Sequence, residues 1–331
     1  MKNGMEKAIL DFPKQFLFKP KIVYRQKLAR AEGALLVGMG GSHLAADTLL
    51  SIMPDLPLRI YHDYGLPKLL KREMVIVSSY SGNTEETIDS FHAARKRKAQ
   101  LAVITTGGAL LELAREHEVP HIVIPNSGIQ PRMALGFGAM AILTLLEKRT
   151  AMNELRLLSR LLHSAFLHEK GKELAKMLKG KVPVIYASER NRALALNWKI
   201  KCNETGKIPA FWNVVPELNH NEMTGFDAKG ETKHLANVFS FLFLKDNMDH
   251  PKVIRRMAVM RELFKKRGLA ITELTLSQKK VTGRPLLSRA YSVYSSLLIA
   301  DWFALQIAKH YGLESEAVPM VEEFKKLIMR A

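Results

Sequence analysis

The sequence predicts an α/β protein made of two successive units, each with a parallel β-sheet covered by helices on both faces. Short apolar runs alternate with segments of helical periodicity, and this alternation is typical of strand–helix–strand units in a parallel sheet. The alternation pauses once and then restarts. The 331 residues are also enough for two domains that each bury a core of their own.

The first unit is expected over residues 31–150, after an amphipathic helical segment at residues 1–30. Its strands are predicted where apolar runs are bounded by turn residues, and its helices where the period changes to that of a helix. The predicted strands are residues 34–38, 58–62, 74–79, 101–105 and 121–124, and the predicted helices are residues 43–52, 85–98, 110–118 and 133–146.

A helical connector is expected at residues 151–180, which are rich in Leu, Lys, Glu and Arg at helical spacing. The second unit, with a C-terminal helix, is expected over residues 181–331. Its predicted strands are residues 182–187, 238–244 and 269–276, and its predicted helices are residues 190–203, 252–266, 286–311 and a short one from residue 318. The restart of the pattern is typical of an internal duplication.

Composition narrows the functional classes. The chain is 47% hydrophobic and carries 50 Lys and Arg against 32 Asp and Glu, a net charge of +18. This apolar content is that of a folded protein, and no apolar run is long enough to span a membrane. Cys202 is the single cysteine, and residues 1–30 lack the pattern of a signal peptide, so we expect a cytoplasmic protein. The charge is compatible with nucleic acid, an anionic membrane surface or a small anionic substrate.

A glycine-rich turn follows the first predicted strand and contains Gly38, Gly40, Gly41, Ser42 and His43. Glycines let the backbone turn sharply and approach a ligand, and the following helix N-terminus offers free N–H groups to an anion. A dinucleotide-binding turn is the rival interpretation, but it needs a third glycine where His43 stands. A tight turn without a ligand is a further alternative.

A dense cluster of hydroxyl groups follows the third predicted strand. Residues 78–87 have the sequence Ser-Ser-Tyr-Ser-Gly-Asn-Thr-Glu-Glu-Thr and lie between a strand end and a helix start. Short hydroxyl donors ahead of a helix N-terminus favour a bound phosphate. Helix capping is the alternative, but it uses one hydroxyl group, so the density of the cluster favours a phosphate cradle.

A third loop, residues 125–132, ends the fifth predicted strand and places Pro131 at the start of a helix beside Arg132. The three loops all follow strands of one parallel sheet, so they are expected to converge where an open α/β sheet binds its ligand. Considered alone, Arg132 is typical of a solvated surface arginine.

The second unit offers candidates for acid–base chemistry. Glu204 is expected at the end of a helix that Gly206 terminates, and the negative end of the helix dipole suits a general base. His220 lies in a polar segment, residues 217–222, flanked by aromatic residues. An ordinary exposed carboxylate and a loop histidine are the alternative. Cys202 has no histidine paired with it in the sequence and is expected to be a buried helix residue.

Metal and nucleic-acid binding are not expected. His, Asp and Glu do not occur at the spacing of a metal site, and no cofactor motif remains. The basic runs at residues 95–98, 265–267 and 279–280 lack interleaved aromatic residues for base stacking, so they are expected to be solvated helix ends. The expected partner is a small molecule rather than nucleic acid or a membrane.

Together these motifs resemble the sugar isomerase (SIS) fold and, within it, the bifunctional phosphoglucose/phosphomannose isomerase family. The matching segments cover nearly the whole chain and are residues 38–42, 79–87, 130–132, 203–204 with 209–211, and 217–222. The resemblance implies two SIS-type, flavodoxin-like three-layer α/β/α subdomains. It also implies a homodimer that interconverts glucose 6-phosphate and mannose 6-phosphate with fructose 6-phosphate without a metal.

The resemblance implies that two groups of residues bind the substrate. The hydroxyl groups that would hold the phosphate are those of Ser79, Ser81 and Thr84, and the residues that would line the sugar are Gly40, Gly41 and Ser42. His43 stands where the family usually has a small residue, so it bears on the room in the sugar pocket.

The resemblance also implies four catalytic residues. Glu204 would move the proton between C1 and C2 through a cis-enediol, and Arg132 would stabilise the enediolate oxygen. His220, contributed across the dimer interface, would open the sugar ring. Lys325 in the terminal helix would assist ring opening, with the adjacent Lys326 as the alternative register.

Two alternatives stay open within this fold. One is an isomerase of a different sugar phosphate. The other is a non-catalytic SIS protein that binds a sugar phosphate and regulates a partner, a role that needs neither Glu204 nor His220.

Overall fold

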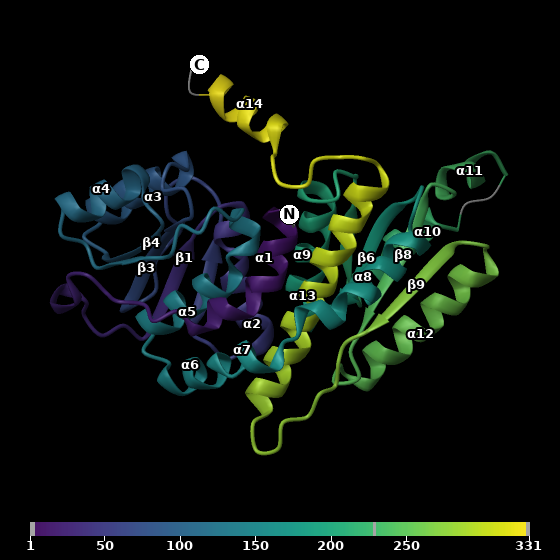
Figure 1. Ribbon diagram of the computed structural model, residues 1–331, viewed down its shortest axis with the longest axis horizontal. Helices are drawn as coiled ribbons and strands as arrows, with labels where there is room; N and C mark the ends of the chain where they lie inside the picture. Colours follow the sequence, from purple (N-terminus) through teal and green to yellow (C-terminus); the bar gives the residue numbers. More distant parts are fainter. Residues whose placement is uncertain (1–3, 228–229, 329–331) are drawn as a thin grey trace. The chain divides into compact units, whose positions relative to one another are not determined.

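The computed structural model describes residues 4–227 and 230–328, and the chain folds into two compact units (Figure 1). The unit called here the N-terminal unit consists of Leu10–His163 and Lys279–Val293. The C-terminal unit consists of the chain up to Ile9, Ser164–Gln278 and the chain from Tyr294 onward. Each unit contains one β-sheet, and every strand pair in both sheets is parallel. The predicted α/β class with parallel sheets is confirmed.

The sheet of the N-terminal unit has five strands in the order β2-β1-β3-β4-β5. Their bounds are β1 Gly33–Val37, β2 Leu58–Tyr61, β3 Glu73–Ser79, β4 Gln100–Thr105 and β5 His121–Val123. In the register, Leu36 lies opposite Ile60 on one side and Ile76 on the other. The direction of strand order reverses between β1 and β3, and in flavodoxin-like sheets this switch point is where a ligand binds.

Helices cover both faces of this sheet. Their bounds are α2 Leu44–Ile52, α3 Glu85–Lys96, α4 Gly108–Glu116, α5 Leu135–Leu145, α6 Arg149–Arg156 and α7 Leu158–Leu161. On one face Val75 and Val103 share a core cluster with Phe91 of α3 and Leu110 of α4. On the other face α2 and α5 pack against each other (Figure 1). This double cover explains why β3 is buried along its whole length.

The sheet of the C-terminal unit repeats this topology with four strands in the order β7-β6-β8-β9. Their bounds are β6 Val182–Ser188, β7 Phe211–Val215, β8 Phe239–Lys245 and β9 Ala270–Thr275. The switch point here lies between β6 and β8. Strand β7 was not among the predicted strands, because its run of Phe, Trp, Asn and two Val residues was interpreted as the aromatic flank of a polar segment.

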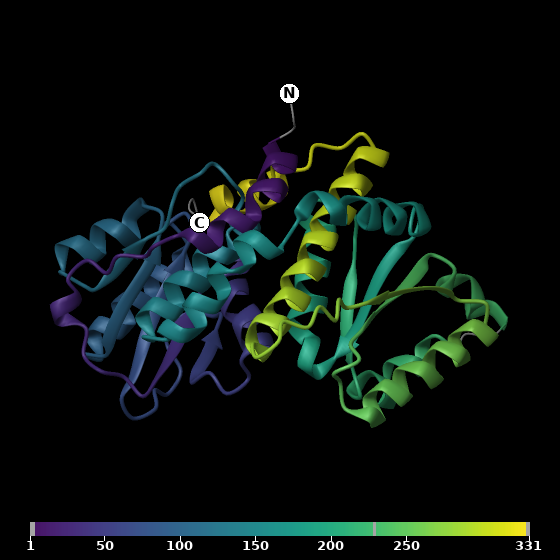
Figure 2. The same ribbon diagram turned by 60° about the horizontal axis from the view of Figure 1, so that its bottom comes forward.

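The long helices of the C-terminal unit are α8 Ser164–Met177, α9 Arg192–Glu204, α12 Pro251–Lys266, α13 Pro285–His310 and α14 Pro319–Ile328, and its short helices are α1 Gly4–Asp11, α10 Glu222–Gly225 and α11 Lys233–Ala236. Helix α12 lies on one face of the sheet, with α9 and α13 on the other (Figures 1 and 2). Met260 and Phe264 of α12 pack with Tyr186 and Phe241 of the strands. Helix α13 begins in the N-terminal unit. Across residues 4–227 and 230–328, no helix is long and apolar enough to cross a membrane.

Candidate functional site

Two loops are joined by hydrogen bonds at the switch point of the N-terminal unit. The glycine loop (residues 38–43) follows β1, and the hydroxyl loop (residues 78–84) follows β3. The Ser42 hydroxyl accepts a hydrogen bond from the backbone N–H of Tyr80 at 2.9 Å. The Ser78 hydroxyl donates to the Ser42 carbonyl oxygen at 3.0 Å. The structure therefore brings Ser42 next to the hydroxyl cluster, as the topology led us to expect.

A third loop, called the arginine loop (residues 125–132), reaches the glycine loop. A Cβ atom at Gly41 would lie 2.7 Å from the backbone nitrogen of Arg132 and 2.8 Å from the Cβ of Pro131. Only glycine permits this close approach of two backbones. The Arg132 side chain is 1% exposed, which corrects the expectation of a solvated surface arginine. The physical reason is that the short 3-10 helix Pro131–Met133 packs directly against the glycine loop.

The hydroxyl loop has a fixed internal geometry. Gly82 has a φ of +73°, and a Cβ there would lie 1.8 Å from the Gly107 carbonyl oxygen, so the position requires glycine. The Ser79 and Thr84 hydroxyl oxygens lie 2.9 Å apart, and Ser79 also accepts from the Gly82 N–H at 3.1 Å. The Ser81 hydroxyl accepts from the Asn83 N–H at 3.3 Å, and Ser81 is exposed.

The Thr84 side chain does not act as a helix cap. Thr84 is the N-cap residue of α3, but its side chain makes no capping hydrogen bond to the described residues of that helix. Its hydroxyl pairs with Ser79 instead. The Thr84 hydroxyl therefore does not cap the first N–H groups of α3, of which that of Thr87 donates to the Thr84 carbonyl oxygen at 3.1 Å. An anion bound at this edge would face the N-terminus of the helix.

His43 turns away from the hydroxyl loop. Its Nδ1 lies 2.5 Å from Asp47 Oδ2, one helical turn along α2, and its ring stacks on His62 with a centroid separation of 5.5 Å. His62 directly follows β2, which lies on the opposite side of β1 from β3. The large side chain is therefore accommodated beside β2 rather than beside the hydroxyl cluster.

In the C-terminal unit, Glu204 is the last residue of α9. It is half-buried, and the Lys207 ammonium donates to its backbone carbonyl at 2.6 Å. Helix α9 is fixed to α13 by a buried ion pair between Lys201 and Asp301, whose side chains are 2% and 3% exposed. The predicted helix end is thus held in place from within the unit.

His220 is exposed at the end of the 3-10 helix Glu217–His220. The segment is anchored by Glu222, which accepts a hydrogen bond from the Tyr186 hydroxyl at 2.5 Å and another from the Asn213 amide. Burial and the neighbouring Glu222 carboxylate raise the pKa of Tyr186 far above its usual value. Glu222 was noted in the sequence only as part of a polar segment, because nothing there connects it to Tyr186.

Lys325 lies on α14, is exposed, and pairs with Glu322 of the same helix at 3.2 Å. Lys326 is exposed beside it. The predicted site residues therefore divide between the two units. The N-terminal unit holds Gly40, Gly41, Ser42, Ser79, Ser81, Thr84 and Arg132, and the C-terminal unit holds Glu204, His220 and Lys325.

The switch point of the C-terminal unit is occupied by its own side chains. The Ser188 hydroxyl donates to Asp249 Oδ1 at 2.7 Å, and the Asn191 amide donates to Asp246 Oδ2 at 3.2 Å. All four residues are buried. Where the N-terminal unit presents hydroxyl groups, this unit presents two carboxylates, which repel a phosphate.

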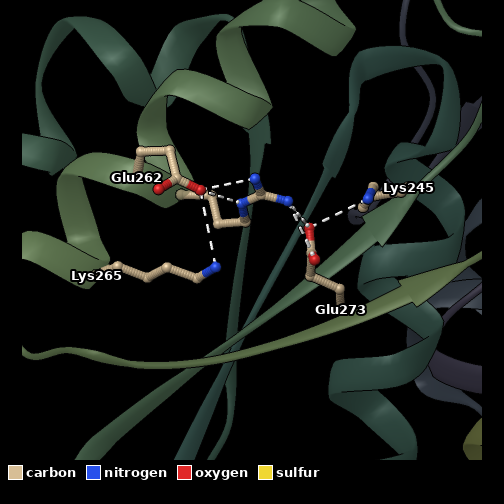
Figure 3. A network of polar contacts seen from close by, with 5 residues as sticks. Lys245, Glu262, Lys265 and Glu273 are labelled. Atoms are coloured by element: carbon tan, nitrogen blue, oxygen red, sulfur yellow. Dashed lines mark hydrogen bonds and ion pairs between the residues drawn. The ribbon is translucent and has the colours of Figure 1, made fainter.

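A second group of charged residues forms a structural network rather than a site (Figure 3). Arg261 of α12 binds Glu262 and also Glu273 of β9, and Lys245 and Lys265 complete the network. Burial pushes the pKa of Glu273 upward, but hydrogen bonds from Arg261 and Lys245 hold it below its usual value. Three positive side chains here share two carboxylates.

The part of the chain that the structure describes offers neither a cluster of metal ligands nor an accessible thiol. It contains no group of three or more His, Cys, Asp or Glu residues that could hold a metal ion. Cys202 is fully buried in α9, and burial raises the pKa of its thiol to about 12. A thiol in this state is a poor nucleophile near neutral pH.

Comparison with known proteins places this fold in a class. Residues 167–328 match the family model described as the bacterial phospho-glucose isomerase C-terminal SIS domain. The C-terminal domain of glucosamine-fructose-6-phosphate aminotransferase from Francisella tularensis has the same fold, with a TM-score of 0.66, 14% identity, and coverage of 96% of this chain and 98% of that one. The fold and this family model define the class of SIS-domain proteins.

Two curated relatives make the assignment narrower. Both are named bifunctional phosphoglucose/phosphomannose isomerase. The protein of Aquifex aeolicus is 33% identical over 89% of this chain and 90% of its own length, and that of Caldicellulosiruptor bescii is 30% identical over 97% and 98%. The chain belongs to the bifunctional phosphoglucose/phosphomannose isomerase family. The predicted family and enzyme class are confirmed.

Proposed function

We propose that the protein interconverts fructose 6-phosphate with glucose 6-phosphate and mannose 6-phosphate by a metal-independent proton transfer between C1 and C2. The observation that best supports this proposal is the geometry of the hydroxyl loop. The hydroxyl groups of Ser79 and Thr84 pair with each other, and the Thr84 side chain does not cap the N-terminus of α3. A phosphate monoester fits this chemistry, because hydroxyl and backbone N–H groups bind its oxygens. The names of the relatives support both epimers as substrates.

In this proposal the N-terminal unit binds the substrate. Ser79, Ser81 and Thr84 hold the phosphate, and the glycine loop residues Gly40, Gly41 and Ser42 line the sugar. The hydrogen bond from Tyr80 to Ser42 supports this assignment, because it links the sugar-lining loop to the phosphate-binding loop.

Glu204 is the proposed base. Its carboxylate takes the proton from C2 of the open-chain aldose, and the electrons of the C–H bond form the cis-enediolate. The same carboxylate returns the proton to C1 while the hydroxyl proton on O2 passes to O1, which gives the ketose. Arg132 stabilises the negative charge that develops on the substrate oxygen, since a guanidinium keeps its proton even when buried. The end position of Glu204 on a fixed helix supports a base that keeps one geometry.

Ring opening is assigned to His220 and Lys325. The proposed enzyme is a homodimer in which His220 of the partner subunit reaches the substrate, and the exposure of His220 suits such a contribution. Lys325 assists as a proton donor to the ring oxygen. We place the protein in the cytoplasm, whose reducing conditions suit a chain with one buried thiol.

A coupled assay tests the proposal. Fructose 6-phosphate is supplied with a chelator present, and formation of glucose 6-phosphate and of mannose 6-phosphate is followed separately. The wild-type protein is expected to form both, and formation of neither would overturn the proposed function. Binding of fructose 6-phosphate in calorimetry without turnover would instead identify the non-catalytic regulator.

The base is tested by Glu204→Gln, which keeps the shape of the side chain and removes its basicity. Turnover is expected to fall about 10²- to 10⁴-fold, the usual contribution of a general base. Glu173→Gln is the matched control, because Glu173 is an exposed glutamate on α8 of the same unit and forms an ion pair with the neighbouring surface residue Lys170. Near wild-type turnover of the Glu204 variant would remove this residue from the mechanism.

A further inference from the structure

The helix that carries Lys325 has little packing of its own. None of the residues of α14, all of which lie within the described part of the chain, is buried. Met320 and Phe324 are 81% and 61% exposed. A helix that buries no side chain takes its position from the segment that leads into it, here the linker of residues 311–318 between α13 and α14.

Lys207 binds that linker and the end of α9 at once. Its ammonium donates to the carbonyl oxygen of Glu204 at 2.6 Å and also to the carbonyl oxygen of Ala317. Ala317 and Glu204 are more than a hundred residues apart in the sequence, so no local periodicity brings them together. Lys207 itself adopts a left-handed backbone conformation with a φ of +57°, which is uncommon for a residue other than glycine.

Glu314 holds the other side of the same linker. Its carboxylate accepts hydrogen bonds from the backbone N–H groups of Glu316 and Ala317, both at 2.6 Å. Burial pushes the pKa of Glu314 upward, but these two bonds and the charge of Lys207 hold it below its usual value. The backbone of Ala317 is therefore hydrogen-bonded on both sides, through its N–H to Glu314 and through its carbonyl oxygen to Lys207. Helix α14 begins two residues later, at Pro319.

We infer that Lys207 is a positioning residue, which ties the helix end bearing Glu204 to the linker that sets the place of Lys325. This inference rests on the proposed function, since it assigns Lys207 the task of keeping the proton-transfer group and the ring-opening group in register. Errors of about 1 Å in such a placement cost up to about a hundredfold in rate. An ammonium suits the role because it has three donors and can bind two carbonyl oxygens together.

The test measures kcat and KM for fructose 6-phosphate in Lys207→Met and Lys207→Arg. Lys207→Met is expected to lower kcat about tenfold with KM within about twofold, because substrate binding does not involve the linker. Lys207→Arg keeps donors for both carbonyls and should recover most of the turnover. Arg97→Met is the matched control, because Arg97 also binds two backbone carbonyl oxygens, those of Pro67 at 2.8 Å and Leu66 at 2.9 Å, and all three residues belong to the N-terminal unit, outside the linker.

A double-mutant cycle with Lys325→Ala separates positioning from general stability. If Lys207 acts by placing Lys325, then Lys207→Met has less than about a twofold further effect on kcat once Lys325 is absent. Independent, multiplicative losses would overturn the inference, and so would normal turnover of Lys207→Met. Should Lys207→Met fail to fold, Glu314→Ala loosens Ala317 from its other side and is expected to give the same non-additivity with Lys325→Ala.

The outcomes for the two proposals are distinct. If Glu204→Gln keeps near wild-type turnover, the proposed function fails. If Glu204→Gln is inactive while Lys207→Met turns over normally, the proposed function stands and only the positioning role of Lys207 is wrong.

Discussion

The hydroxyl oxygen of Ser42 accepts a hydrogen bond from the backbone N–H of Tyr80 at 2.9 Å, across 38 residues of sequence. This bond joins the loop after β1 to the loop after β3, on the two sides of the switch point. The Ser42 side chain therefore fixes the relative placement of the two strand ends.

Ser79→Ala tests the phosphate cradle. The change removes the hydroxyl that pairs with Thr84 and accepts from the Gly82 N–H. A hydrogen bond to a charged group is worth about 1.5 to 3 kcal/mol, so the inhibition constant for inorganic phosphate should rise about tenfold or more. Competitive inhibition by phosphate, with fructose 6-phosphate as substrate, measures it.

Two variants accompany this experiment. Thr84→Ser keeps a hydroxyl next to Ser79 and should leave phosphate affinity nearly unchanged. Thr144→Val removes a hydroxyl from α5 that donates to the Met140 carbonyl in the same unit, and it should have no effect on phosphate inhibition. An unaltered inhibition constant for Ser79→Ala would place the phosphate elsewhere.

Tyr186→Phe tests the anchoring of the His220 segment. Because burial and Glu222 keep the pKa of Tyr186 far above its usual value, its hydroxyl is a hydrogen-bond donor at every working pH. Without it, the Glu222 carboxylate keeps the hydrogen bond from Asn213 but loses the one from Tyr186, and kcat should fall about fivefold, the equivalent of a hydrogen bond worth about 1 kcal/mol. Steady-state kinetics with KM reported separately measures the effect. Tyr61→Phe, which loses a bond to a backbone carbonyl in the other unit, serves as the control, and equal losses in both variants would contradict the anchoring role.

Cys202→Ala tests the burial of the thiol through the pH dependence of stability. The folded thiol has a pKa of about 12, and the unfolded thiol has one of about 8.5. Above pH 8.5 the unfolded chain loses this proton while the folded chain keeps it, so the stability due to Cys202 is complete below pH 8.5 and is lost as the pH rises toward 12. The wild type should therefore lose about 2 kcal/mol relative to Cys202→Ala by pH 10. Urea unfolding of both proteins at pH 8, 9 and 10 measures the difference, and parallel pH profiles would refute it.

Lys201→Met tests the buried ion pair that fixes α9 to α13. The variant leaves the Asp301 carboxylate buried without its ammonium partner, and both side chains are almost completely inaccessible. Removing one member of such a pair costs about 3 to 5 kcal/mol, whereas replacing both with apolar residues is often neutral. Lys201→Met should therefore lower the free energy of unfolding strongly, and the double variant Lys201→Met/Asp301→Leu should regain most of it. Urea unfolding compares the three proteins. A loss of unfolding free energy below about 1 kcal/mol in the single variant would show that Lys201 and Asp301 do not form a buried ion pair.

The sheets and their loops could be predicted because their signals are local. The run at residues 74–79 was expected as a strand and lies within β3, Glu73–Ser79, and the helix expected at residues 190–203 is α9, Arg192–Glu204. Apolar runs, glycines and hydroxyl clusters mark where strands end. The parallel sheet was expected to bring these loops to one edge, and the structure has the loops after β1 and β3 on neighbouring strands.

What could not be predicted depends on contacts between distant residues. Arg132 considered alone was expected at the surface, but it is 1% exposed, and its backbone lies close against Gly41. The pairing of Tyr186 with Glu222 spans 36 residues, and that of Lys207 with Ala317 spans 110. Contacts over such distances along the chain leave no periodic pattern in the sequence, so both contacts could be recognised only in the folded structure.

The buried side chains at the switch point between β6 and β8 distinguish the two units. The two sheets share their strand order around the switch point, but Asp246 and Asp249 fill this edge of the C-terminal sheet with the chain's own carboxylates. In the proposed function, the N-terminal unit accordingly holds the anion and the C-terminal unit supplies the acid–base groups. Random substitutions that weaken substrate affinity should fall mainly in the N-terminal unit, and those that lower turnover mainly in the C-terminal unit. Engineering a second anion site into the C-terminal unit would first require replacement of Asp246 and Asp249.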